Sequence, residues 1–226
     1  MSLTLVIGNK NYSSWSMRPW FAMKMAGIAF DEVLVPLYEP GSAETIRSYS
    51  PAGKVPVLVD GAVTVWESLA ILEYLAERHP EAQLWPRDAR ARAHARAVAH
   101  EMHAGFLPLR RECPMNMWHP PRAGTLSPEA EANVRRIEAI WLECREHFGR
   151  GGPFLFGAFS NADAMFAPVV SRFETYRIAV APVAMRYMNA IRATAPWHLW
   201  RSAALEERWV MSGNEPDWPS VPRLYA

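Results

Sequence analysis

Residues 53–68 read GKVPVLVDGAVTVWES, and this stretch decides the fold. Residues 55–59 and 63–66 are rich in β-branched side chains, and Asp60-Gly61 separates the two runs. An Asp-Gly pair between two such runs is a strong signal for a β-hairpin. Residues 67–78 follow directly and place leucines at helical spacing. The stretch therefore predicts a hairpin that leads straight into a helix.

The residues before this hairpin alternate between strand and helix patterns. Residues 3–7, LTLVI, form a short apolar run typical of a buried strand, and 30–37 form a second strand-like run. Residues 9–16 are polar and turn-like, 17–26 show helical spacing that ends at Gly27, and 43–48 suit a short helix. The predicted order is β-α-β-α-β-β-α, a mixed sheet covered by helices in an α/β domain at residues 1–80.

The second half of the chain lacks strand signals and reads as an all-helical domain at residues 87–210. A linker at 81–86 precedes it. Ser127-Pro128 opens a long helix and Gly149 closes it, because serine caps a helix start and glycine suits a helix end. Other helices are expected at 88–105, 160–176, 182–194 and 197–209. Residues 211–226 form a Pro-rich tail, expected to lie extended over the surface from Glu215 onward.

Composition excludes several classes of protein. Half of the 226 residues are hydrophobic and 21% are charged, which excludes an intrinsically disordered chain. The net charge of +1 gives no support to nucleic acid or an anionic membrane as a partner. Cys113 and Cys144 form neither a zinc spacing nor a disulfide framework. The N-terminus lacks the basic region of a signal peptide. We therefore expect a soluble cytoplasmic protein.

The loop at residues 12–19, YSSWSMRP, carries the first candidate site. It lies between the first strand and the first helix, and ligands bind beyond the carboxyl ends of strands in open α/β sheets. A helix N-terminus adds free N–H groups and partial positive charge, so a serine hydroxyl there could donate to an anion such as a thiolate. The alternative is that one serine simply caps the helix.

Two further motifs flank the hairpin. A cis peptide before Pro56 would leave the Val55 backbone free to pair with a peptide-like ligand, but only about 5% of X–Pro bonds in folded proteins are cis. The sequence therefore predicts a trans bond. Ser68 can cap the helix that follows, while its N–H can hold a carboxylate. Glu67 either complements the helix dipole or receives a ligand ammonium.

These three motifs resemble the glutathione transferase family in order and spacing. A fourth resemblance lies in the helical half, where Ser160 and Asp163 match the family's N-capping box. By this resemblance, residues 1–80 are similar to the thioredoxin-like glutathione domain. Residues 87–210 are similar to the helical domain that supplies the second-substrate pocket. The resemblance covers nearly the whole chain.

The resemblance implies a set of site residues and a partner, glutathione. Ser13 matches the serine that donates to the glutathione sulfur, with Ser14 as the second and Tyr12 as the third candidate. The glycyl carboxylate would lie near Lys54 and the cysteinyl part beside the Val55-Pro56 step. The γ-glutamyl end would lie at Glu67 and Ser68. The resemblance also implies a homodimer and a role in detoxification, and the residue spacing gives no reason to expect a metal.

The loop SSWSMR looks most like the SSCS-type loop of the zeta class, which is linked with maleylacetoacetate isomerase. It differs at Trp15, where the zeta loop has cysteine. We therefore expect transfer of glutathione to a small electrophile. The alternatives are a maleylacetoacetate-type isomerase and a non-catalytic binding module on the same fold. Candidates for the electrophile pocket, each with core packing as its alternative, are Met102, His103, Phe106, Leu107 and Trp118.

Two other patterns carry little weight. His94, His100 and His103 invite a metal site, but the fourth ligand and the HExxH pattern are missing. A basic run within residues 87–96 lies on an Ala-rich helix, where a solvated face is its simplest interpretation.

Overall fold

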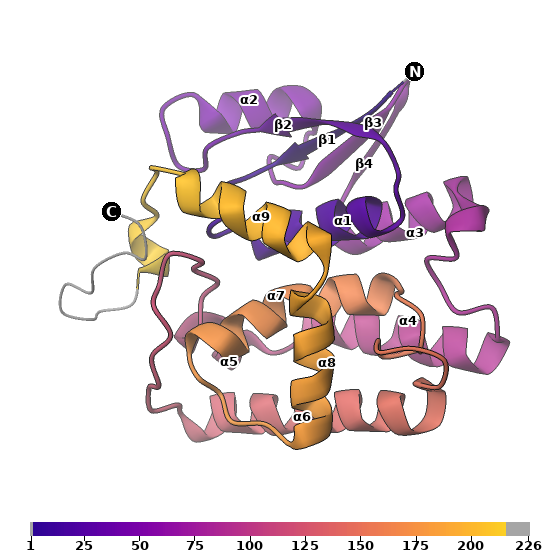
Figure 1. Cartoon of the computed structure of the whole chain (residues 1–226). Helices are drawn as coiled ribbons and strands as arrows, with labels where there is room; N and C mark the ends of the chain where they lie inside the picture. The colour runs from indigo at the N-terminus through magenta and orange to yellow at the C-terminus, as the bar shows by residue number, and fades with distance from the viewer. Residues whose placement is uncertain (1, 216–226) are drawn as a thin grey trace.

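The computed structural model describes residues 2–215, in which a small sheet and its helices lie on top of a layer of helices (Figure 1). Of the predicted tail at 211–226, residues 216–226 lie outside the described residues, and Ser212–Asn214 form a short 3-10 turn. Within residues 2–215, no helix is long and apolar enough to cross a membrane.

The sheet has the predicted mixed topology. Its strands are β1 (Leu3–Ile7), β2 (Phe30–Leu34), β3 (Val57–Asp60) and β4 (Val63–Trp66), in the order β2-β1-β3-β4. β1 pairs parallel to β2 and antiparallel to β3. β3 and β4 form the expected hairpin, in which Asp60 pairs with Val63 and Gly61 takes a φ of +59°. Glycine suits this position because the left-handed region penalises residues with a Cβ.

Helices cover both faces of the sheet. α1 (Ser14–Met25) and α3 (Ser68–Arg78) lie between the sheet and the helical layer, while α2 (Ser42–Tyr49) lies on the opposite face (Figure 1). Ile46 of α2 packs there with Val6, Val35 and Val57 in a small core of its own. The main core lies on the α1 side, so α1 is enclosed between two apolar layers.

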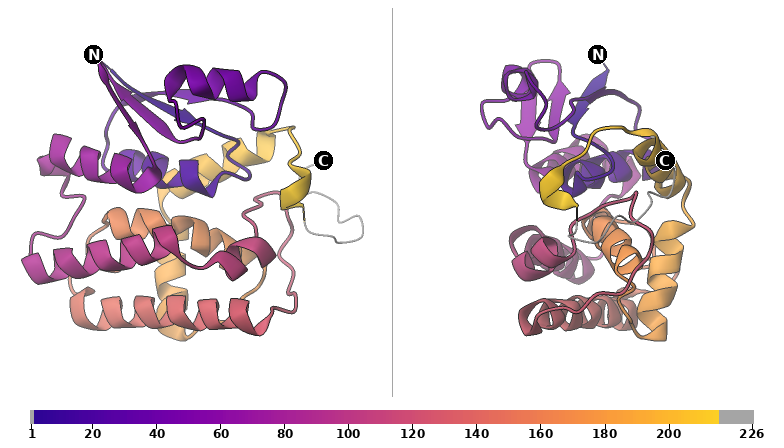
Figure 2. Two further views of the ribbon diagram at one scale, coloured as in Figure 1. Left: turned by 180° about the vertical axis from the view of Figure 1, so that it is seen from behind. Right: turned by 90° about the vertical axis from the view of Figure 1, so that its left-hand side faces the viewer.

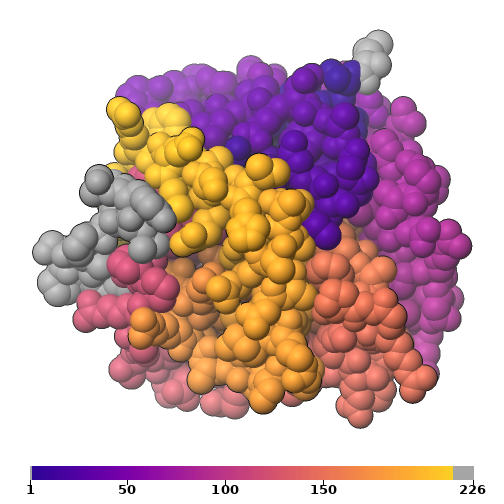
Figure 3. Space-filling model, viewed as in Figure 1, coloured from indigo at the N-terminus to yellow at the C-terminus, as the bar shows by residue number. Residues whose placement is uncertain are grey.

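The helical half contains α4 (Ala89–Ala104), α5 (Leu107–Glu112), α6 (Pro128–Phe148), α7 (Asn161–Thr175), α8 (Pro182–Arg192) and α9 (Ala195–Glu206). α7 packs against α1, α4 and α8 and is buried along almost its whole length. α9 returns to the sheet-bearing half, where it contacts α1 (Figures 2 and 3). One continuous core, centred on Trp141 and α7, runs into the interior face of the sheet.

Several predicted boundaries were wrong by two or three residues. α1 begins at Ser14 instead of residue 17, because Ser13 caps it by accepting the Ser16 N–H at 3.3 Å. The second strand ends at Leu34, and β3 begins at Val57. α5 was not predicted; Phe106, with a φ of +64°, separates it from α4. α9 begins at Ala195 because Thr194 caps it.

The predicted capping box is present at the start of α7. Asp163 is fully buried and accepts hydrogen bonds from Leu155 N at 3.0 Å, Ser160 N at 2.8 Å and Ser160 Oγ at 3.0 Å. Burial raises the pKa of Asp163 to about 6, so the carboxyl is mostly ionised at neutral pH and accepts these bonds as an anion. It therefore joins the preceding loop to the central helix.

Asp163→Ala should lower the free energy of unfolding by about 2–5 kcal/mol, because it leaves buried N–H groups without acceptors. Asp88→Ala is the matched control, since Asp88 caps α4 in a more exposed position through a single bond to Ala91 N. The control should lose about 0.5–2 kcal/mol. Urea unfolding of both variants measures the difference, and equal losses would contradict the role given to Asp163.

Candidate functional site

A cavity of about 570 Å³ opens beside the N-terminus of α1, within the size range of small-molecule sites. The loop after β2, the segment before β3 and the start of α3 form its walls. The sequence-predicted residues that line it are Ser13, Lys54, Val55, Pro56, Glu67 and Ser68. The structure thus brings these six residues, which lie far apart in the sequence, to one cavity.

Ser13 stands at the N-terminus of α1, on the wall of the cavity. Its Oγ lies 2.8 Å from Ser16 Oγ, to which it donates, and Ser16 Oγ also accepts from Gly8 N at 3.0 Å. Ser13 therefore both caps the helix and faces the cavity, so the two interpretations of the serine are compatible. The positive end of the helix dipole coincides with this hydroxyl.

The other two candidates in the loop point elsewhere. Ser14 Oγ accepts from a terminal nitrogen of Arg172 at 3.4 Å, on the side of the helical domain. Tyr12 donates its hydroxyl to Glu215 at 2.5 Å, and its ring meets the edge of Trp118. Neither residue is among those that line the cavity. Of these three candidates, Ser13 is therefore the one that lies on the cavity wall.

The bond between Val55 and Pro56 is cis, so the prediction of a trans bond was wrong. That prediction used only the general rarity of cis bonds, which carries no information about the loop around this one. Gly53, with a φ of +61°, precedes Lys54 in the same wall.

The start of α3 differs from the prediction in which residue caps it. Glu67 occupies the N-cap position with a φ of +68°, and its side chain is 52% exposed. Ser68 is the first helical residue and is fully buried, so it does not cap the helix. Its Oγ has no hydrogen-bond partner among the described residues. A carboxylate that is exposed next to an unsatisfied hydroxyl suits a polar ligand with both donors and acceptors.

Most of the predicted electrophile-pocket residues are ordinary core or surface side chains. Met102, Phe106 and Trp118 are buried in packing contacts, and Leu107 is 52% exposed. His103 contacts two residues that line the cavity: its ring meets the edge of Trp15, and its Nε2 lies 3.8 Å from Glu67. Burial lowers the pKa of His103, which favours the neutral imidazole.

A group of arginines behind Trp15 was missed at the sequence level. Arg18 is fully buried; its Nε donates to Met165 O at 3.3 Å, while both terminal nitrogens have no acceptor among the described residues. Its guanidinium lies 4.3 Å from the Trp15 ring centre, and that of Arg110 lies 4.9 Å from it. The signal was available: Arg18 interrupts the apolar run of a buried helix.

Burial lowers the pKa of Arg110 and of Arg172 to about 10 and holds the pKa of Arg18 well below its usual value, and the three cations also repel one another. Buried charges are ordinarily paired. Arg18 therefore stands out as a buried cation without an acidic partner among the described residues; it does not line the cavity, because the Trp15 ring lies between them. The histidines that suggested a metal do not converge: His94 packs beside Phe148, and His100 contacts its own helix. Residues 2–215 hold no group of three metal-ligating side chains.

Comparison with known proteins gives consistent results. The family model described as glutathione S-transferase, N-terminal domain, matches residues 12–78. A probable maleylacetoacetate isomerase of Caenorhabditis elegans is 31% identical over 172 residues, 75% of this chain and 79% of that protein. Maleylacetoacetate isomerase of Rattus norvegicus is 27% identical over 175 residues, 75% of this chain and 78% of that protein.

Among solved structures, a glutathione transferase homologue from Burkholderia with bound glutathione superposes with a TM-score of 0.69 at 22% identity. The match covers 92% of this chain and all of that one. This likeness shows that the fold is shared across both halves of the molecule. Taken with the extent of the match to the Caenorhabditis elegans protein, it shows that the chain belongs to the glutathione S-transferase family.

Proposed function

We propose that the chain binds glutathione in the cavity beside α1, holds it as the thiolate at Ser13 and transfers it to a small electrophile. The observation that carries the proposal is that Ser13, at a helix N-terminus, lines the same cavity as the polar ends of two other segments. One end carries Lys54, and the other carries Glu67 and Ser68.

The cavity's charges match the groups of glutathione. Glu67 is an exposed carboxylate that can receive the γ-glutamyl ammonium, while the buried Ser68 and the N-terminus of α3 can donate to the neighbouring carboxylate. The Val55 backbone would pair with the cysteinyl amide group, and Lys54 would lie near the glycyl carboxylate. This orientation directs the thiol towards Ser13.

The energy needed to form the thiolate is within reach of these groups. A free thiol has a pKa of about 8.5, and lowering it by two units takes ~2.7 kcal/mol. One hydrogen bond to a charged acceptor contributes roughly 1.5–3 kcal/mol, and a helix dipole adds 0.3–1 kcal/mol. Ser13 can supply the bond by turning its proton from Ser16 Oγ to the sulfur, while Ser16 donates to Ser13 in return. Ser13 therefore need not ionise.

A second candidate function is the isomerisation of a maleyl compound, and the buried arginines favour it. Addition of the thiolate to the cis double bond would leave a single bond that can rotate, and expulsion of the thiolate would then regenerate glutathione. Maleyl compounds carry carboxylates, and the unpaired terminal nitrogens of Arg18 could receive one of them once the Trp15 ring, which lies between Arg18 and the cavity, turns aside.

A cytoplasmic homodimer with a role in detoxification is part of the same proposal. Val63 and Trp66 of β4 are large apolar side chains that are 45% and 43% exposed. The two stand three positions apart and so point to opposite faces of the strand, and Trp66 also lines the cavity; Val63 is therefore the one of the two that suits contact with a second copy. Sedimentation of the purified chain tests the dimer.

Calorimetric titration with reduced glutathione tests the proposed function directly. Saturable binding, one per chain, with proton release near neutral pH is expected, because the bound thiol ionises. The absence of binding at millimolar glutathione would leave a non-catalytic module on the same fold.

Ser13→Ala should raise the pKa of the bound thiol by about one to two units and lower kcat/KM on the order of 100-fold, because the donor to the sulfur is lost. Ser14→Ala is its matched comparison and should leave the thiol pKa unchanged, since Ser14 faces Arg172. Thiolate absorbance titrated against pH measures both. The reverse pattern would transfer the donor role to Ser14.

Ser68→Ala should weaken glutathione binding about tenfold while changing the free energy of unfolding by less than about 0.5 kcal/mol, because its buried hydroxyl lacks a partner in the free protein. Ser16→Ala should instead lower the free energy of unfolding by about 1–3 kcal/mol, since Ser16 bonds Gly8 and Ser13. Calorimetry and urea unfolding separate the two effects. A stability loss in Ser68→Ala equal to that in Ser16→Ala would contradict this account.

An unreactive dicarboxylate such as succinate should raise the Tm of the chain by binding at the arginines. Arg18→Met should abolish that rise without lowering stability, because replacing an unpaired buried charge by an apolar side chain relieves its desolvation. Arg78→Met is the control, since Arg78 is exposed and pairs with Asp60. If the rise persists in Arg18→Met, the anion binds elsewhere.

A further inference from the structure

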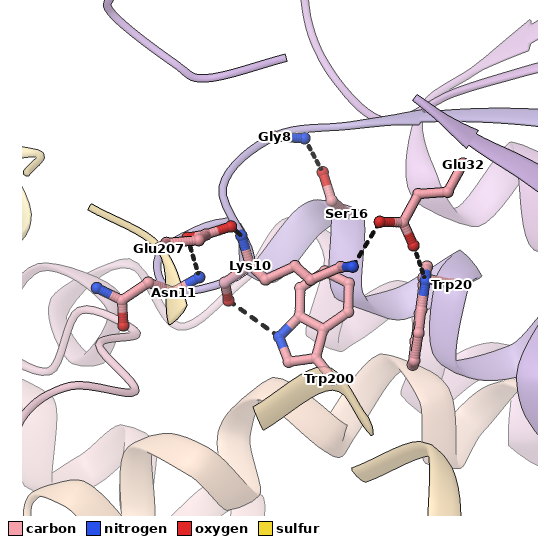
Figure 4. Close-up of polar contacts among 8 residues, drawn as sticks. All are labelled: Gly8, Lys10, Asn11, Ser16, Trp20, Glu32, Trp200 and Glu207. Carbon is pink, nitrogen blue, oxygen red and sulfur yellow. Dashed lines mark hydrogen bonds and ion pairs between the residues drawn. The ribbon is translucent and has the colours of Figure 1, made fainter. Parts of the chain in front are cut away.

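The end of α9 lies beside the loop that precedes α1, although the two are almost 200 residues apart in the sequence (Figure 4). Glu207 is the residue that follows α9. Its carboxylate accepts from the backbone N–H of Lys10 at 2.6 Å with one oxygen and from that of Asn11 at 3.0 Å with the other. Two consecutive N–H groups that face one anion form a compact binding arrangement, and each bond is strengthened by the charge.

Glu207 binds the backbone of the loop and not the side chain of Lys10. The ammonium of Lys10 turns away from Glu207 and pairs with Glu32 at 2.5 Å, while Glu32 also accepts from Trp20 Nε1 at 2.6 Å (Figure 4). Removing the Lys10 side-chain pair would therefore leave the contact of Glu207 in place. Glu32 and Glu207 therefore lie in one cluster but bind different groups: Glu32 binds side chains, and Glu207 binds the loop backbone.

Two further polar groups of the loop are also held from the helical half. Trp200 Nε1 donates to Lys10 O at 2.9 Å, and Asn11 Oδ1 accepts from Met117 N at 2.6 Å and Trp118 N at 3.0 Å. Between them, these contacts leave the Lys10–Asn11 backbone little freedom to rotate. Among the contacts that hold this backbone, those made by the Glu207 carboxylate are the ones that involve a charged group.

The loop passes this constraint to the cavity through Asn9. Asn9 O accepts from Ser13 N at 2.8 Å, closing the turn that ends at the cap of α1. Asn9 Oδ1 accepts from Leu37 N at 2.8 Å, and Leu37 lies in the opposite wall of the cavity. A shift of the loop would therefore move the Ser13 hydroxyl relative to that wall.

We propose that Glu207 is a positioning residue for catalysis, which acts through the Lys10–Asn11 backbone to set the Ser13 hydroxyl against the glutathione sulfur. The inference rests on the proposed function of Ser13. It assigns to the helical half a task in activating the thiol, in addition to any contact with the second substrate.

The test compares Glu207→Ala and Glu207→Gln with two controls. Glu206→Gln changes the exposed neighbour, and Glu32→Gln removes the other carboxylate of the cluster without touching the loop backbone. The readouts are the pKa of the bound thiol, kcat and KM for glutathione measured separately, and hydrogen exchange of the Lys10 and Asn11 amides.

Glu207→Ala should raise the thiol pKa by roughly half a unit to one unit and lower kcat on the order of tenfold, because the donor is displaced. Exchange at the two amides should be faster. Glu207→Gln keeps one acceptor oxygen and should show a smaller change in the same direction, and it carries the test if the alanine variant does not fold. Both controls should keep the wild-type thiol pKa.

A folded Glu207 variant that keeps the wild-type thiol pKa would overturn the inference, even if its loop amides exchange faster. An equal change in Glu32→Gln would do so too, since it would indicate a general effect of losing stability. Ser13→Ala, measured in parallel, distinguishes the failures. If it raises the thiol pKa while Glu207→Ala does not, only the inference fails; if neither changes it, the role of Ser13 fails first.

Discussion

The seating of α1 between the sheet and α7 is the constraint on which the rest of the structure depends. From Ser16 to Met23 every residue of this helix is buried, so its rotation and position are set by close packing on both sides. The same placement brings Ser13 to the cavity wall, puts the Trp15 ring between the cavity and the arginines, and buries Arg18. The packing of α1 therefore sets the position of the helix, the direction of its dipole and the placement of the site residues together.

Features that depend on neighbouring residues could be predicted from the sequence. The Asp60-Gly61 hairpin and the Ser160–Asp163 box each rest on contacts within a few residues, and both are present. The start of α1 was predicted three residues late, because the polar residues after Ser13 resemble a turn although they already belong to the helix that Ser13 caps. The separation of α5 was missed because it depends on Phe106 adopting a positive φ, for which the sequence pattern held no signal.

The two sides of the candidate site also differ in how well short sequence motifs predict them. The side proposed for glutathione is formed within the first 80 residues from short motifs, so most of its residues could be listed in advance: Ser13, Lys54, Val55, Pro56, Glu67 and Ser68 line one cavity, whereas Ser14 does not. The side facing the helical domain depends on side chains that meet across long sequence distances. His103 meets Trp15 and Glu67 of the cavity wall from the helical half, and Arg18 and Arg172 likewise bond across the two halves, to Met165 and Ser14. Local patterns do not contain that information.

The continuous core has a consequence for how such a chain can change over time. Because the apolar side chains of the sheet, α1 and α7 interdigitate in one cluster, neither half has a self-sufficient interior that could be exchanged for a relative's. A chimera joined in the linker at 81–86 would set side chains of unrelated shapes against one another along α1 and α7. New substrate preferences in this fold are therefore expected to arise by small substitutions where α1 packs against α7, with compensating changes in the opposite half. Recombination of whole domains is expected to produce them less readily.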